Sequence, residues 1–235
     1  MIEDLLRHAL AEADVAEHTV VLLLVPGQAP EGASEFAYLP PGHWRDLENS
    51  VLAAAEPELS TQPYSECHRF AAYANDTLPA GGLPVGLRHE AEHAAIFDRH
   101  GRPFAELESI LRLTMKRARR NDDYSQIPSE REANRAARAF AETHYAEAIN
   151  GLAADPRTQQ FVSDVEQVPD VIGETAAMIW RYAEPEEIDE QDDDKRPFRA
   201  VVAELEQQAR AKARIDPRYW QPRPNDVPIV VQLAR

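Results

Sequence analysis

Two histidines four residues apart, His89 and His93, form the pattern with the clearest chemistry in this sequence, which reads His-Glu-Ala-Glu-His from residue 89. Hydrophobic spacing predicts a helix over residues 85–99. Residues four apart lie on one face of a helix, so both imidazoles can bind the same metal ion. Glu90 can then take a proton from a water on that ion. Zinc lowers the pKa of its bound water to about 7, and a nearby carboxylate collects the proton that the water releases. Zinc-dependent peptide hydrolysis needs both groups in this arrangement.

The pattern requires a third metal ligand, because a catalytic zinc normally has three protein ligands and keeps one position for water. The metzincin pattern would continue with glycine at 96 and histidine at 99. Those positions hold Ile96 and Arg99, so the metzincin class is excluded. The remaining option is a carboxylate from a later helix.

Residues 130–137, Glu-Arg-Glu-Ala-Asn-Arg-Ala-Ala, offer such a carboxylate near the start of an Ala-rich helix predicted to run to about residue 154. Glu130 and Asn134 are one turn apart, so Glu130 can bind the metal while the Asn134 amide orients a histidine ligand. Glu132 is the alternative ligand. The interpretation favoured for Glu132 is a capping carboxylate, with Ser129 as the N-cap of the helix.

The two motifs together, residues 89–93 and 130–137, resemble those of the gluzincin-type ImmA/IrrE metallopeptidases, in which H-E-x-x-H is followed by E-x-x-A-[ND]. The resemblance implies a zincin-like fold with His89, His93 and Glu130 as zinc ligands and Glu90 as general base. It also implies limited proteolysis of a regulatory protein such as a transcriptional repressor. Glu92 departs from the family, whose members commonly have a small residue there.

Two other interpretations of the chain stay open. A catalytically silent regulatory or interaction protein can retain a metallopeptidase-like fold, with structural zinc or with none. The motif can also be accidental, in a helical scaffold with an acidic surface. Apolar residues around the motif argue against an exposed helix face: Leu87, Ala91, Ala94, Ala95 and Ile96.

Charge and composition narrow the range of partners. Among 235 residues, 25 Lys and Arg stand against 41 Asp and Glu, a net charge of -16. This balance excludes nucleic-acid binding through bulk charge. No apolar run reaches the roughly 20 residues that span a bilayer, and the first residues lack the features of a secretory signal. The single cysteine, Cys67, is interpreted as a buried hydrophobe and excludes an internal disulfide, so we expect a cytoplasmic protein. The metal-binding motifs lead us to expect a protein or peptide as its substrate.

Hydrophobic periodicity predicts an α+β fold that is mostly helical, with a small sheet and a C-terminal helical extension. The resemblance to the ImmA/IrrE metallopeptidases implies that this mostly helical domain is zincin-like. The expected domains are residues 1–155 and residues 156–235, and the second can be part of the first. Strands are expected at residues 19–25, 67–74 and 227–233, the last at a sheet edge because of Pro228. Helices are expected at residues 2–10, 44–56, 85–99, 104–120, 129–154, 171–183 and 198–215.

Weaker candidates remain outside the two motifs. Tyr124 and His144 can each donate a hydrogen bond to a developing oxyanion, although their spacing selects neither. Residues 116–120, Lys-Arg-Ala-Arg-Arg, are expected to end a solvated helix, where cations interact favourably with the helix dipole. The acidic block at 184–194 is expected to be a solvated loop.

Overall fold

The computed structural model describes residues 2–15, 19–30, 35–42, 50–59, 64–74, 82–144, 166–183, 197–213 and 229–233. The chain divides into two compact units with interleaved sequences. The sheet unit comprises Met1–Ala95, Ala133–Val165 and Trp220–Arg235, and the helical unit comprises Ile96–Glu132 and Glu166–Tyr219. The expected α+β class is confirmed, with most elements helical, one small sheet and a helical part near the C-terminus. The domain boundary expected after residue 155 lies outside the described residues.

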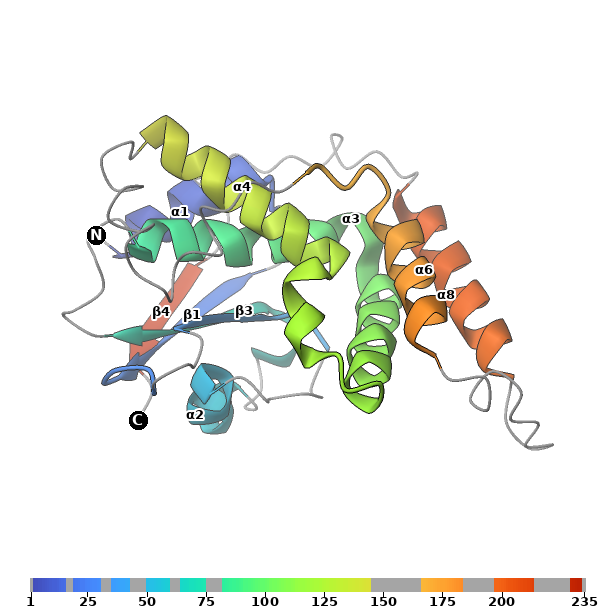
Figure 1. Ribbon diagram of the computed structural model, residues 1–235. Coiled ribbons are helices and arrows are strands. Elements are labelled where there is room, and N and C mark those ends of the chain that lie inside the picture. Colours follow the sequence, from blue (N-terminus) through green and yellow to red (C-terminus); the bar gives the residue numbers. More distant parts are fainter. Residues whose placement is uncertain are drawn as a thin grey trace. The chain divides into compact units, whose positions relative to one another are not determined.

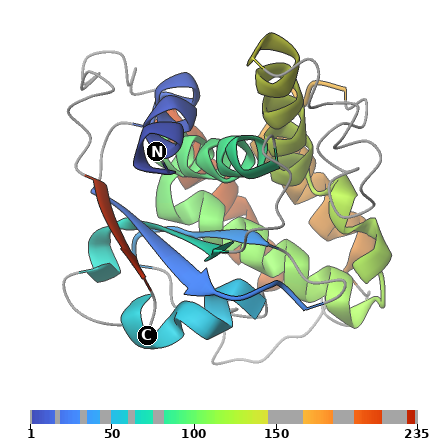
Figure 2. The same cartoon turned by 90° about the vertical axis from the view of Figure 1, so that its left-hand side faces the viewer.

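The sheet has four strands in the order β2-β3-β1-β4. Strand β1 (Val20–Pro26) pairs in parallel with β3 (His68–Ala74) on one side and with β4 (Ile229–Leu233) on the other. The edge position expected for the C-terminal strand is therefore confirmed, and Figure 2 shows β4 beside β1 at the margin of the sheet. Strand β2 (Phe36–Leu39), which is not among the strands expected from the sequence, pairs antiparallel with β3.

Both faces of the sheet are covered by helices, which explains the nearly continuous apolar sequence of β1. Helix α1 (Ile2–Ala13) and the first part of α3 (Gly82–Arg117) cover one face, and α2 (Ser50–Leu59) covers the other (Figure 1). Alternate β1 residues point to opposite faces. Val20 and Leu22 belong to the core beneath α1 and α3, whereas Val21, Leu23 and Val25 belong to the core beneath α2.

The histidine motif lies on the helix segment that packs against this sheet. Leu87, Ala91 and Ala94 of α3 join the core formed with Leu22 of β1 and Phe70 of β3. Helix α3 approaches the sheet closely at Gly86, where an added Cβ would lie 2.5 Å from an atom of the Phe36 ring. Only glycine allows that approach without a shift of the ring.

The helical unit is built from the remainder of α3, the short helix η2 (Asn121–Gln126), the first turn of α4 (Pro128–His144), α6 (Val171–Tyr182) and α8 (Phe198–Ala213). Its core is apolar and buried: Ile96, Phe104, Leu107, Leu111, Met115, Ile127, Ile172, Ala176, Met178, Ile179, Val202, Leu205 and Ala209. Asp170 caps α6 by accepting a hydrogen bond from the Gly173 N–H at 3.0 Å. Among the described residues, no helix combines the length and apolar character that crossing a membrane requires.

Two expected helix boundaries can be compared with the structure. The helix end expected at residues 100–103 is present as a break at Gly101, whose φ of 72° is left-handed, and the chain then continues as helix to Arg117. The N-cap expected at Ser129 is wrong. The Arg131 N–H donates to the Ile127 carbonyl at 2.9 Å, so the helix begins at Pro128, in the first-turn position that proline favours.

Several further expectations lie partly outside the described residues. Parts of three expected helices and of the edge strand lie outside the described residues: 44–49, 145–154, 214–215 and 227–228. The acidic block at 184–194 also lies outside them. The basic run at residues 116–120 does end a helix, with Lys116 and Arg117 in the last turn of α3.

His100 of the helical unit gives the fold a predictable pH dependence. Burial, followed by the charge of Arg99, lowers the pKa of His100 to about 4 from an ordinary value near 6.5. Between these values the unfolded chain binds a proton that the folded chain does not, so stability falls as the pH falls. We expect His100→Gln to remove about 1–2 kcal/mol of the stability difference between pH 7 and pH 5. Urea unfolding of both proteins at the two pH values measures this, and equal pH dependence would contradict it.

Candidate metal centre

His89 and His93 lie one turn apart on α3 and turn their rings toward each other. Their Nε2 atoms are 3.2 Å apart, and the ring centroids are 4.9 Å apart. His89 is buried, with 4 % of its surface exposed, while His93 is partly buried. A separation of 3.2 Å fits either an N–H···N hydrogen bond or two lone pairs that face one shared ion. The two side chains that the sequence predicts as metal ligands therefore face each other within the sheet unit.

Glu90 and Glu92, the two acidic residues of the motif, are both buried. Glu92 forms an ion pair with Arg88, one turn earlier on α3, with Nη2 and Oε2 2.9 Å apart. Both side chains are about nine-tenths buried, at 8 % and 11 % exposed. The position where the ImmA/IrrE metallopeptidases commonly have a small residue thus carries half of a buried ion pair in this chain. A solvated Glu at this position is excluded.

Removing Glu92 leaves the Arg88 guanidinium buried without this partner. We expect Glu92→Leu to lower the free energy of unfolding by about 3–5 kcal/mol, whereas Arg88→Met with Glu92→Leu costs less, because the double change removes both charges. Urea unfolding of the two variants measures the difference. If both variants lose the same free energy of unfolding, the unpaired charge of Arg88 is not the cause of the loss.

Glu130 belongs to the helical unit, in the first turn of α4, and is buried with 7 % of its surface exposed. Its Oε1 accepts a hydrogen bond from Arg112 Nη2 at 3.0 Å. Arg112 also donates from Nε to Glu108 at 3.0 Å, which fixes the guanidinium between two carboxylates. Arg112 is a residue that the sequence pattern did not single out. Its i,i+4 relation to Glu108 on α3 was the available signal.

Glu132 has a role within the helical unit that differs from capping α4. Its Oε1 accepts a hydrogen bond from the buried backbone N–H of Val168 at 2.6 Å. The capping-box interpretation is therefore wrong, since the carboxylate binds the segment that precedes α6. Glu132, the alternative to Glu130 as a metal ligand, therefore already uses one of its oxygens in this hydrogen bond.

Asn134 follows on the part of α4 that belongs to the sheet unit, and only 5 % of its surface is exposed. Its Oδ1 is buried and has no hydrogen-bond donor among the residues that the structure describes. A buried amide oxygen of this kind normally accepts a hydrogen bond. An amide that orients a histidine ligand would accept the hydrogen bond of the imidazole N–H with this oxygen.

The weaker candidates have other partners. The Tyr124 hydroxyl accepts a hydrogen bond from Arg112 Nη1, and the Arg112 guanidinium lies 4.6 Å from the centroid of the Tyr124 ring. His144 ends α4 and contacts Glu12 of α1. Burial raises the pKa of the Cys67 thiol, which supports its interpretation as an inert hydrophobe beneath α2.

Comparisons with known proteins add no identification: no family model, no curated protein and no solved structure matches the chain. The family resemblance therefore depends on the two motifs alone. The ligand set and the activity stay predictions.

Proposed function

We propose that the chain is a zinc-dependent metallopeptidase that cleaves a peptide bond in a regulatory protein. The observation that carries this proposal is the orientation of His89 and His93, whose Nε2 atoms face each other across 3.2 Å beside the buried Glu90. Two nitrogens, each about 2.0–2.1 Å from one tetrahedral zinc, lie about 3.3 Å apart. The 3.2 Å separation in the structure matches that value before any rearrangement of the rings.

Glu130 is proposed as the third ligand. Two imidazole nitrogens and one carboxylate oxygen form a typical catalytic zinc set and leave a position for water. Arg112 holds Oε1 of Glu130, and a carboxylate has a second oxygen with lone pairs to offer. Arg112 would thus act as a positioning residue. The engagement of Glu132 with the Val168 N–H favours Glu130 over Glu132 for this role.

Asn134 supports a metal ion shared by His89 and His93 over a direct hydrogen bond between the two imidazoles. A histidine that binds zinc through Nε2 carries its proton on Nδ1 and normally donates it to an oxygen acceptor. The buried Oδ1 of Asn134 is an acceptor without a donor among the described residues. We propose that it orients one of the two histidine ligands.

The reaction follows from the positions of the protein groups. Zinc, when bound, supplies Lewis acidity that activates water and polarises a peptide carbonyl. Glu90 takes the proton of the attacking water and then delivers it to the nitrogen of the departing amine. With only 8 % of its surface exposed, Glu90 acts where bulk water competes little for that proton.

The substrate class comes from the resemblance to the ImmA/IrrE metallopeptidases, which implies limited proteolysis of a regulatory protein such as a transcriptional repressor. A net charge of -16 favours basic or neutral peptide segments over acidic ones. A cytoplasmic location is part of the proposal, since a chain with one cysteine, Cys67, forms no internal disulfide.

The proposal is tested with the full chain and two measurements. Mass spectrometry of the purified protein gives the zinc content, and incubation with a mixed peptide library gives the cleaved bonds. We expect at least one zinc per chain, and cleavage that stops with a chelator and returns with zinc. A protein that binds no zinc, or that cleaves equally well with the chelator, contradicts the proposal.

A further inference from the structure

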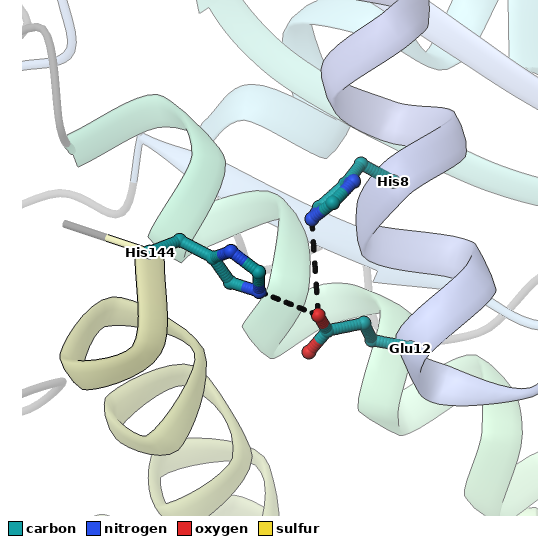
Figure 3. Close-up of side chains that lie close together, drawn as sticks. All are labelled: His8, Glu12 and His144. Atoms are coloured by element: carbon teal, nitrogen blue, oxygen red, sulfur yellow. Dashed lines mark hydrogen bonds and ion pairs between the residues drawn. The ribbon is translucent and has the colours of Figure 1, made fainter.

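A second group of metal-binding side chains lies in the sheet unit, where α1 meets the last turn of α4 (Figure 3). His144 Nε2 is 2.6 Å from Glu12 Oε1, and His8 Nε2 is 3.7 Å from the same oxygen. One donor atom from each residue lies within 4.8 Å of the others. Neither histidine has a part in the proposed peptidase chemistry.

The helices position these side chains for simple reasons. His8 and Glu12 are one turn apart on the exposed face of α1, while Leu6 and Leu10 bury the opposite face. His144 comes from the last turn of α4, 132 residues from Glu12 in the sequence. The two imidazoles stand edge to face, with ring centroids 4.8 Å apart.

The Phe140 ring packs against the imidazole rings of both His8 and His144. It is buried on α4, one turn before His144, and its ring centroid lies 5.4 Å from that of His8 and 4.8 Å from that of His144. Packing of both imidazoles against one buried ring restricts their movement. Less side-chain entropy is then lost when both nitrogens bind one ion.

Hydrogen bonding accounts for only part of the cluster. The 2.6 Å contact between His144 and Glu12 is a complete imidazole–carboxylate hydrogen bond by itself. His8, at 3.7 Å from the same oxygen, is beyond hydrogen-bond distance, yet its Nε2 faces the pair. A shared cation uses all three donor atoms, whereas the hydrogen bond uses two.

From this geometry we propose that His8, Glu12 and His144 bind a second transition-metal ion, which links α1 to α4. Two imidazole nitrogens and one carboxylate oxygen favour zinc, nickel or copper over magnesium or calcium, which prefer all-oxygen sites. The side chains of His8, Glu12 and His144 are 50 %, 39 % and 30 % exposed, so water can complete the coordination. The excess of acidic residues raises the local concentration of cations.

The experiment uses the full-length variant His89→Ala with His93→Ala, which lacks the proposed catalytic pair, and zinc alone as the probe. Titration against a chromophoric chelator should show one remaining zinc per chain. Adding His8→Gln or His144→Gln should weaken that binding at least about 10-fold, because one of three ligands is lost. Thermal unfolding at one zinc concentration should show a smaller zinc-induced rise in Tm for the two derived variants than for the parent variant.

Glu142→Gln in the same background is the matched control. Glu142 is an exposed carboxylate in the last turn of α4 that pairs with Arg138, so its removal changes the charge but no proposed ligand. Zinc binding should persist in this control. Binding that is absent from the parent variant, or that is weakened equally by Glu142→Gln and His8→Gln, overturns the second site. Neither result bears on the peptidase proposal, which is tested by zinc and turnover in the chain with His89 and His93 intact.

Discussion

Glu90→Gln should lower kcat for peptide cleavage by about 100- to 10,000-fold while zinc content stays unchanged. General acid–base catalysis by a positioned carboxylate contributes an effect of this size. Glutamine has nearly the same shape but cannot accept the proton of the attacking water. The residue is buried beside His89, so an isosteric change keeps the packing of α3 against the sheet. Turnover of a cleaved library peptide, with zinc measured on the same sample, gives both quantities.

Glu92→Gln is the matched control for this substitution, since Glu92 is a second buried carboxylate of the same motif and pairs with Arg88. It should lower stability while retaining most of the turnover per folded molecule. If Glu90→Gln keeps full turnover, Glu90 is not the base. If the wild-type chain binds zinc and regulates a partner without cleaving it, the catalytically silent alternative is the better description.

Glu130→Gln should weaken zinc binding more than about 100-fold and abolish cleavage at limiting zinc. Loss of a residue that only orients a ligand costs about 10- to 100-fold in affinity, and loss of the ligand itself should cost more. A neutral amide oxygen is a weaker zinc donor than a carboxylate. Competition with a chelator of known affinity measures the change in Kd.

Glu132→Gln is the control, two residues away on α4. Its side chain accepts a hydrogen bond from the Val168 N–H, and a glutamine oxygen can still accept that bond. Zinc affinity should therefore stay within a few-fold of that of the wild type. The reverse result, with zinc lost on changing Glu132 and kept on changing Glu130, would assign the third ligand to Glu132.

The sequence predicted elements well where hydrophobic periodicity was long. Helices α1, α6 and α8 and strands β1 and β3 all lie where it placed them. Each of these helices buries one apolar face, and each of these strands buries apolar residues on both faces of the sheet. Strand β2 could not be predicted in this way. It has only four residues, and its pairing with β3 involves residues 30 to 36 positions away.

The start of α4 shows a different limit. Ser129 and Glu132 have the spacing of a capping box, which is a local signal. The structure instead begins the helix at Pro128 and uses Glu132 to bind Val168 in a distant segment. A buried backbone N–H that needs an acceptor outweighed the local motif.

The candidate site was predictable to the extent that its residues share one helix. His89 and His93 are related by helical spacing, so their facing nitrogens follow from the sequence. The cluster of His8, Glu12 and His144 was not predictable, because its third member comes from another helix. Only the packing of α1 against α4 brings it into contact with the first two.

The central claim, that His89, His93 and Glu130 hold a zinc ion, is tested most directly by a crystal structure of the zinc-loaded chain with anomalous scattering recorded at the zinc edge. The account predicts an anomalous peak about 2.0–2.2 Å from both Nε2 atoms and from one oxygen of Glu130. An anomalous map without a peak at the histidine pair, or with a peak whose third protein ligand is not Glu130, would contradict it.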